Sequence, residues 1–265
     1  MILTTVTDEV QEQMALENIF ETAKQQGIYN FEIRAIEGRR VPDFDDDMIR
    51  RLKNCKKEQG VTFSAISPGI FKVPLGSEEF NYHKDKLLTA SLDFAEELGI
   101  NRIIIFGIQR SEKDRLEDYQ QVVNEIGEAA YKAKKRGMEI LIENEPGWWA
   151  DTSENCSNIL KSISCRNLKL NWDLGNLYNS GEKDYKKGYE LLKDYIANVH
   201  VKDMLSTDGG VICVPAGEGE IDYESQLKDL EQDGYNGCIT IETHMSPLYP
   251  NFLKSSAYIK KILNW

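Results

Sequence analysis

Short apolar, β-branched runs alternate with longer segments of helical periodicity along the whole chain. Eight runs have the length and composition of buried strands, and they cover residues 2–7, 30–36, 61–67, 101–107, 138–144, 168–173, 197–203 and 238–244. Between them, apolar residues recur at i, i+3 and i+4, most clearly in 78–99 and 114–137. Both of these segments end on a glycine, which favours the left-handed conformation that closes a helix. The pattern predicts repeated βα units.

Eight such units without a linker favour a single (β/α)8 TIM barrel spanning residues 1–265 over an open doubly wound sheet. A doubly wound nucleotide-binding sheet often carries G-x-G-x-x-G after its first strand, and this chain has none there. The glycine-rich segment "AGEGEID" at 216–222 follows a loop and lacks that fingerprint. Nucleotide binding is therefore not expected.

The composition is that of a soluble globular protein, with 41% hydrophobic and 29% charged residues. No apolar run approaches the roughly 20 residues that span a bilayer, so no membrane partner is expected. The first residues reach Asp8 and Glu9 before a signal peptide could form. The five cysteines are scattered and form no C-x-x-C pair, which favours reduced thiols in a cytoplasmic protein.

A formal net charge of −12 disfavours nucleic acid as a partner, because that binding draws most of its affinity from lysine and arginine against phosphates. The basic cluster "KAKKR" at 132–136 closes a predicted helix, where cations complement the helix dipole. We expect chemistry on a small molecule.

Polar side chains end the last four predicted strands. They are Glu143, Asp173, His200 and Glu242, separated by 30, 27 and 42 residues, each about one βα unit. The carboxyl ends of barrel strands carry the active site in nearly all TIM-barrel enzymes. Neighbouring strands would therefore direct these four side chains to one point above the barrel.

Three carboxylates and an imidazole crowded together carry a high desolvation cost unless a cation is present. The mixed oxygen and nitrogen set suits Mn²⁺, Mg²⁺, Co²⁺ or Zn²⁺, and the sequence does not choose among them. Taken singly, each residue could instead be a strand-end group paired with a loop lysine. Four on consecutive strands favour a divalent metal site.

The segment "NVHVKDM" at 198–204 places His200 inside an apolar run. Strand alternation puts Asn198, His200 and Lys202 on one face and Val199 and Val201 on the other. His200 is then the one nitrogen ligand, on the inward face of a strand end. Lys202 could bind a carboxylate, a phosphate or a sugar hydroxyl, or pair with Asp203.

A metal next to the carbonyl of an α-hydroxy ketone would acidify the neighbouring C–H and stabilise an enediolate. Glu143 and Glu242 lie on the fifth and eighth predicted strands, on opposite sides of the expected metal. One could remove a proton while the other delivers one to the opposite face, which inverts a stereocentre.

Several of these segments resemble one known family. They are "LIEN", "LNWDLGN", "VHVKD", "PAGEGEIDY" and "GYNGCITIETH", and they resemble the sugar phosphate isomerase/epimerase family of xylose-isomerase-like TIM barrels, related to tagatose and psicose 3-epimerases. The resemblance implies Glu143, Asp173, His200 and Glu242 as metal ligands, with the two glutamates also serving as the acid/base pair.

Two positions depart from the ketose epimerases of that family. Many of them carry a histidine three residues after the strand-six aspartate, where this chain has Asn176, and an amide cannot shuttle a proton. They also tend to carry an arginine shortly after the strand-seven histidine, where this chain has Lys202. Both departures weaken the case for a free-ketohexose 3-epimerase.

Other candidates are less specific. One of Trp148 and Trp149, with Trp149 the candidate taken forward, is expected to stack on a sugar at the pocket. Glu32 and Arg34, in "FEIRA" at 31–35, could both reach the same rim, or simply pair with each other. His244 follows Glu242 and is a further substrate-binding candidate, expected in the loop. His83 is expected to be an ordinary surface residue outside the barrel.

The leading hypothesis is a metal-dependent sugar isomerase or epimerase acting on a small ketose, sugar phosphate or related polyol. The first alternative is a dehydratase in which the same enediolate expels a β-hydroxyl as water. An abasic-site endonuclease is disfavoured by the acidic balance and the three histidines, and a non-catalytic binding protein is the last alternative. A homodimer stays open, because "SSAYIKKILNW" at 255–265 carries apolar residues that could cover a neighbour.

Overall fold

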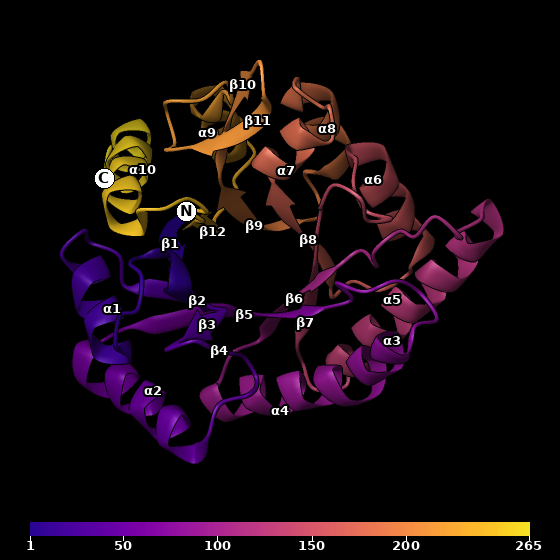
Figure 1. The fold of residues 1–265 in the computed structure, drawn as a ribbon, viewed down its shortest axis with the longest axis horizontal. Coiled ribbons are helices and arrows are strands. Elements are labelled where there is room, and N and C mark those ends of the chain that lie inside the picture. The colour runs from indigo at the N-terminus through magenta and orange to yellow at the C-terminus, as the bar shows by residue number, and fades with distance from the viewer.

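Eight parallel strands close into a barrel in the computed structural model, which describes residues 1–265 (Figure 1). The strands are β1 (Ile2–Val6), β2 (Asn30–Ile33), β5 (Thr62–Ile70), β6 (Arg102–Phe106), β7 (Glu139–Glu143), β8 (Leu168–Asp173), β9 (Ile196–Val201) and β12 (Cys238–Ile241). They pair in chain order, and β12 pairs with β1 to close the barrel. The predicted (β/α)8 architecture is confirmed.

Helices surround the strands on the outside of the barrel (Figure 1). The α-helices are α1 (Leu16–Lys24), α2 (Asp46–Gln59), α3 (Glu78–Tyr82), α4 (Leu88–Leu98), α5 (Tyr119–Lys134), α6 (Ser153–Ser162), α7 (Leu174–Asn179), α8 (Tyr185–Leu192), α9 (Tyr223–Gln232) and α10 (Leu248–Leu263). None of the helices is long and apolar enough to span a bilayer.

Local signals set several helix ends. The Asp45 carboxylate accepts a hydrogen bond from the Met48 N–H, which caps the start of α2. Gly99 and Gly137 follow α4 and α5 with positive φ angles of 67° and 69°, as the sequence predicts. The absence of a Cβ makes that conformation accessible at little cost.

The long helix predicted for 78–99 is interrupted. A π-helical turn over His83–Leu87 separates α3 from α4. Nδ1 of His83, the first residue of that turn, accepts a hydrogen bond from the Phe71 N–H at 2.9 Å. The prediction of His83 as an ordinary surface residue is therefore wrong, because its ring is partly buried and tied to the backbone after β5. The helix predicted for 114–137 begins later, at Tyr119, after a 3₁₀ turn.

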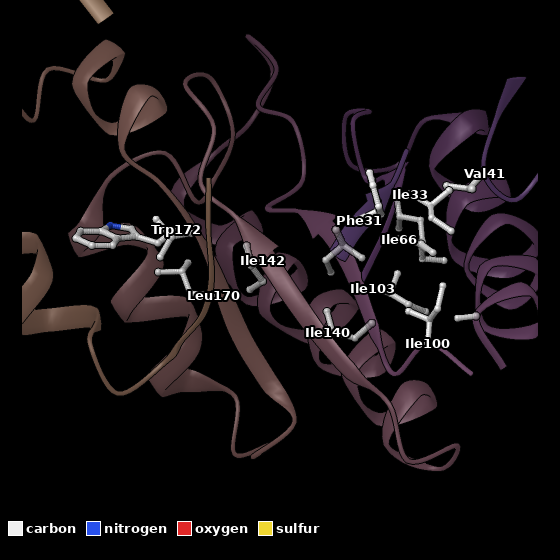
Figure 2. Close-up of a cluster of buried hydrophobic side chains, with 14 of the residues drawn as sticks. Phe31, Ile33, Val41, Ile66, Ile100, Ile103, Ile140, Ile142, Leu170 and Trp172 are labelled. Carbon is white, nitrogen blue, oxygen red and sulfur yellow. The ribbon is translucent and has the colours of Figure 1, made fainter. Parts of the chain in front are cut away.

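The main apolar core lies between the barrel and its helices and comprises 62 buried residues. Figure 2 shows part of it, with Phe31 and Ile66 on the right and Leu170 and Trp172 on the left. Burying each such side chain stabilises the fold by about 1.5–3 kcal/mol relative to leaving it exposed. This layer holds the strands that position the polar residues inside the barrel.

The apolar cluster inside the barrel is much smaller than this outer core, and buried polar side chains also lie inside the barrel. Ala65, Ile104, Leu141 and Ala197 form a separate apolar cluster of four. A hydrogen-bonded network of polar side chains also lies buried in the chain, in which Thr240 Oγ1 donates to Asn198 Oδ1 at 2.8 Å and Asn198 Nδ2 donates to Asn171 Oδ1 at 2.8 Å. Interior polar groups of this kind must be paired to be tolerated.

Two short hairpins extend from the barrel. The segment predicted as strand 30–36 breaks at Arg34, and Ala35–Ile36 (β3) pairs with Arg39–Arg40 (β4). The segment predicted as strand 197–203 ends at Val201, and Asp203–Thr207 (β10) pairs with Gly210–Val214 (β11). The strand predicted for 238–244 ends at Ile241, so His244 lies in the loop as expected.

Candidate active site and metal centre

A cavity of about 380 Å³ opens at the carboxyl ends of the barrel strands. Six residues that the sequence singled out line it, namely Arg34, Glu143, Asn176, Lys202, Glu242 and His244. Asp173 and His200 lie beside Glu143 and Glu242 below the cavity floor, and both are almost fully buried. The cavity is of the size that suits a small-molecule ligand.

The four predicted ligand residues come together in one cluster, and one ligand atom from each lies within 4.8 Å of the others. His200 Nδ1 lies 3.7 Å from Glu143 Oε1, 4.0 Å from Asp173 Oδ2 and 3.5 Å from Glu242 Oε2. This ring nitrogen is buried and has no hydrogen-bond partner. A lone nitrogen facing three carboxylate oxygens is the donor set that a divalent cation satisfies, so these residues could hold a metal ion.

Glu32 lies beneath His200 and fixes its orientation. His200 Nε2 is 2.8 Å from Glu32 Oε2, and Asn198 Nδ2 donates to the same oxygen at 3.2 Å. With the proton on Nε2, the lone pair of Nδ1 points toward the three carboxylates. Glu32 is fully buried and does not line the cavity. Its expected place on the substrate rim and its alternative pairing with Arg34 are both wrong, because it points into the barrel interior.

Replacing Glu32 with glutamine is expected to raise the dissociation constant for Mn²⁺ or Zn²⁺ by about 10–100-fold. Glutamine can still accept a hydrogen bond from His200, but it removes the negative charge that strengthens the imidazole as a ligand. Isothermal titration calorimetry on the folded variant measures the change. An unchanged dissociation constant would show that Glu32 does not support a metal ligand.

Lys202 occupies the side of this cluster. Its ammonium nitrogen lies 2.8 Å from Asp173 Oδ2 and 3.0 Å from Glu242 Oε2, and the side chain is buried. Burial would lower the pKa of Lys202, but the charges of Asp173 and Glu242 outweigh it and raise the pKa well above its ordinary value. Conversely, burial would raise the pKa of Glu242, but Lys202 and His200 hold it well below its ordinary value. Lys202 is therefore protonated, and so positively charged, in the resting cluster.

The alternative pairing of Lys202 with Asp203 is wrong, because the Asp203 carboxylate is already occupied. Gly217 and Gly219 donate their N–H groups to Asp203 Oδ2 at 2.9 and 3.1 Å, and Ile221 donates to Oδ1 at 3.2 Å. A Cβ at Gly219 would stand 2.1 Å from Asp203 Oδ1. The glycine-rich segment thus closes around an internal carboxylate, and it fixes the chain next to Lys202.

Replacing Lys202 with methionine is expected to destabilise the metal-free protein by about 3 kcal/mol, because two buried carboxylates lose their cation. Added divalent metal should then raise the melting temperature of the variant more than that of the wild type. Differential scanning fluorimetry with and without metal measures both effects. Lys228→Met is the control, because Lys228 forms an exposed pair with Glu224. Equal metal-induced shifts in the wild type and Lys202→Met would contradict the role of Lys202.

Arg34 neutralises negative charge in a second group of candidate metal ligands. Glu9, Glu242 and His244 also come close enough to share an ion, but the Arg34 guanidinium lies between the carboxylates. It contacts Glu9, and its Nη1 lies 2.5 Å from Glu242 Oε1. Arg34 supplies the positive charge that this second group needs, so the geometry favours one metal.

His244 borders both groups. It is half exposed, and its Nδ1 lies 3.7 Å from an oxygen of Glu9 and of Glu242. Hydrogen bonding to Glu242 and Glu9 raises the pKa of His244 to about 9. At the cavity edge it is placed to meet a substrate oxygen as a donor.

Asn176 is positioned by the turn that starts α7. Its N–H donates to Asp173 Oδ1 at 2.8 Å, so Asp173 caps this helix as well as facing the cluster. The Asn176 side chain donates to the Asn144 carbonyl at 2.9 Å. Asn176 lines the cavity, as expected. The two hydrogen bonds hold its amide rigidly.

Trp149 does not line the cavity, so its expected stacking place is wrong. Its ring packs against Tyr119, with centroids 6.3 Å apart, and under the Arg110 guanidinium at 4.2 Å. The aromatic residue in the wall is Phe106, at the end of β6. Trp148 packs against Phe106 from behind, with centroids 6.2 Å apart. Trp149 is buried in the main apolar core, and the Trp148 N–H donates to the Glu145 carbonyl at 3.1 Å in the turn that follows β7.

The sequence analysis missed several residues of the cavity wall, among them Arg40, Lys72 and Glu145. Glu145 follows Glu143 by two residues, a spacing that could have indicated it. Burial and the negative charge of Glu143 raise the pKa of Glu145 to about 7. Arg40 and Lys72 gave no periodic signal, because Arg40 lies in the two-residue strand β4 and Lys72 in the loop after β5, both outside the barrel strands.

Comparison with known sequences agrees with this architecture. A family model described as "Xylose isomerase-like TIM barrel" matches residues 20–265. Among curated relatives, the inosose dehydratase of Clostridium perfringens is 24% identical over 294 residues, covering 97% of this chain and 95% of the relative.

Solved structures share the fold at low sequence identity. The probable 3-DHS dehydratase of Bacillus anthracis superposes with a TM-score of 0.81 at 20% identity and covers 98% of this chain and 99% of its own. A zinc-bound structure of the IOLI protein gives 0.84 at 17% identity, covering 100% and 98%. An L-ribulose 3-epimerase gives 0.77 at 16% identity, covering 100% and 95%.

Proposed function

The chain belongs to the xylose isomerase-like TIM barrel family, and from the site built on its barrel we propose that it is a metal-dependent dehydratase of a small keto-polyol. The sequence favoured an isomerase or epimerase with a dehydratase as the alternative, and we reverse that order. Curated relatives named inosose dehydratase and the likeness to a probable 3-DHS dehydratase support the reversal.

The observation that carries the proposal is the unequal setting of the two glutamates. Both oxygens of Glu242 face cations, with Arg34 at 2.5 Å and Lys202 at 3.0 Å. Glu143 has neither contact, and the basic side-chain nitrogen within 4.0 Å of its carboxylate is His200 Nδ1, at 3.7 Å. Two-sided epimerisation needs both carboxylates to exchange protons, and a carboxylate between two cations is a weak base.

Elimination of water needs one base and one proton donor, and the cavity offers both. Glu143 is the base that removes the proton next to the substrate carbonyl. A divalent cation held by Glu143, Asp173, His200 and Glu242 would supply positive charge beside that carbonyl, which acidifies the C–H. The C–O bond at the β-carbon then breaks as the C=C bond forms.

Lys202 is the donor in this scheme. Its ammonium lines the cavity beside Glu242, and it protonates the departing hydroxide so that water leaves. Asn176 and His244 lie on the same wall and orient substrate hydroxyls by hydrogen bonds. The net reaction removes one water and requires no oxidant or reductant.

An epimerase is the second candidate, because Glu143 and Glu242 enter the cluster from β7 and β12, which are not neighbouring strands. The fold shared with an L-ribulose 3-epimerase is compatible with it. In this alternative, Glu242 would give its proton to the face opposite Glu143.

Mass spectrometry in deuterium oxide separates the two candidates. The protein is incubated with Mn²⁺ or Zn²⁺ and a panel of cyclic and open-chain keto-polyols. A product lighter by one water supports the dehydratase. Deuterium incorporation without loss of water would instead establish the epimerase, and no change in any substrate would reject both.

A further inference from the structure

The wall of the cavity opposite the metal cluster carries its own positive charge. Three candidate ligands lie in β7, β8 and β9, and Glu242 directly follows β12; these are the fifth to eighth strands of the barrel. Arg40 lies in β4, after the second barrel strand, and Lys72 follows the third barrel strand, β5. Both line the same cavity. A small substrate lying across it meets the metal cluster on one side and these cations on the other.

Arg40 is held in place without using its charge. Its Nη2 donates to the Ser67 carbonyl at 3.0 Å, and the guanidinium lies over Gly69, where a Cβ would stand 3.3 Å from Cζ. No carboxylate oxygen lies within 4.0 Å of the nitrogens of the Arg40 guanidinium, the distance that defines an ion pair. Arg40 is exposed at the mouth of the cavity, and partial desolvation together with the charge of Arg34 lowers its pKa.

The neighbouring arginine shows the contrast. Arg39 lies in the same short strand and pairs with Asp45 at 2.5 Å on the outside of the barrel. Lys72 lies 3.6 Å from Glu145 Oε2 and 4.0 Å from the centre of the Phe106 ring, so its pairing is loose. Arg40 is thus the cation of this wall that pairs with no carboxylate. Apart from the bond to the Ser67 carbonyl, the N–H groups of its planar guanidinium are available, and that geometry binds carboxylates and phosphates.

The adjoining hollow does not compete for the same group. It measures about 670 Å³, lies between the segment after β1 and the β3–β4 hairpin, and shares Asp8 and Arg40 with the catalytic cavity. Its other charged residues are Glu12 and Glu37, which repel an anion. An anionic group at Arg40 therefore lies on the side of the catalytic cavity.

We propose that Arg40 selects substrates that carry an anionic group, a carboxylate or a phosphate monoester, at the end away from the metal cluster. The inference rests on the proposed function and narrows its substrate from keto-polyols in general to acidic ones. Arg40 contacts only the anionic group in this scheme, so it determines specificity and takes no part in proton transfer.

Calorimetry with three non-reacting ring polyols tests the inference. Quinate carries a carboxylate, inositol 1-phosphate carries a phosphate, and myo-inositol is neutral. In the metal-loaded protein, we expect one of the anions to bind at least about 10-fold more tightly than myo-inositol. Arg40→Gln should remove that preference without changing the affinity for myo-inositol. Arg40→Lys should retain part of it, and Arg39→Gln should retain all of it.

The two anions distinguish the sources of charge, since a preference for quinate alone identifies a carboxylate and one for inositol 1-phosphate alone identifies a phosphate. Equal binding of all three compounds by the wild type, or equal effects of Arg39→Gln and Arg40→Gln, would overturn the inference. Loss of water from a neutral ketone with no anion preference overturns the inference and leaves the proposed function standing. An anion preference that disappears in Arg40→Gln, with no loss of water from any ketone, supports the inference and rejects the proposed function.

Discussion

Glu143→Gln is expected to lower kcat by about 10³-fold at saturating metal, within the usual range for loss of a catalytic base. Glutamine keeps one oxygen for a metal ion but cannot take up a proton. Glu143 is also the carboxylate that neither Arg34 nor Lys202 contacts. Steady-state turnover of the best ketone in the panel, with product followed by mass spectrometry, measures the effect.

The matched control is Glu139→Gln. Glu139 lies at the opposite end of the same strand and pairs with Arg102 at 2.9 Å, far from the cavity in the register of β7. We expect its turnover to stay within about threefold of the wild type, since partly exposed pairs contribute little. Equal turnover in Glu143→Gln and the wild type would assign the base elsewhere, and Glu242 would be the next residue to replace.

Removal of divalent metal by a chelator is expected to abolish turnover and to lower the melting temperature by roughly 5–10 °C. The estimate follows from a metal present at about 100 times its dissociation constant, which stabilises the fold by about 2.7 kcal/mol, with roughly 2–4 °C per kcal/mol for a chain of this size. Both properties should return when Mn²⁺, Co²⁺, Zn²⁺ or Mg²⁺ is added back. The metal that restores turnover at the lowest concentration is the best candidate for the native one.

Asp173→Asn is the control for this experiment. Asparagine can still accept the Asn176 N–H and cap α7, so the helix keeps its first turn. It is a weaker metal ligand than aspartate, and the metal-induced shift should shrink or vanish. A full shift in Asp173→Asn, or no effect of the chelator on the wild type, would argue against a metal at the four-residue cluster.

The barrel and the convergence of the cluster followed from local patterns. Eight apolar runs of the right length predicted the strands, and the spacing of Glu143, Asp173, His200 and Glu242 by single βα units placed them at one end. The alternation in "NVHVKDM" also holds, since Val199 and Val201 belong to the outer core while Asn198 and His200 face the interior. Strand period and barrel topology are enough for such inferences.

The partners of the charged side chains did not follow from the sequence. Lys202 lies next to Asp203 in the chain, yet it pairs with Asp173 and Glu242, while the backbone of the glycine-rich segment takes up Asp203. Glu32 is separated from His200 by 168 residues and lies directly beneath it. Pairing of this kind depends on which side chains the closed barrel brings within 4 Å, a distance that local spacing does not encode.

The sequence by itself determined the fold and the identity of the four clustered residues, because strand alternation and βα repetition act over short stretches of chain. Tertiary structure alone decided which carboxylate carries two cations and which has neither. It also turned Trp149 away from the cavity and left Arg40 without a partner inside it. These differences arise because barrel closure sets the distances between charges, and those distances determine which groups can act on a substrate.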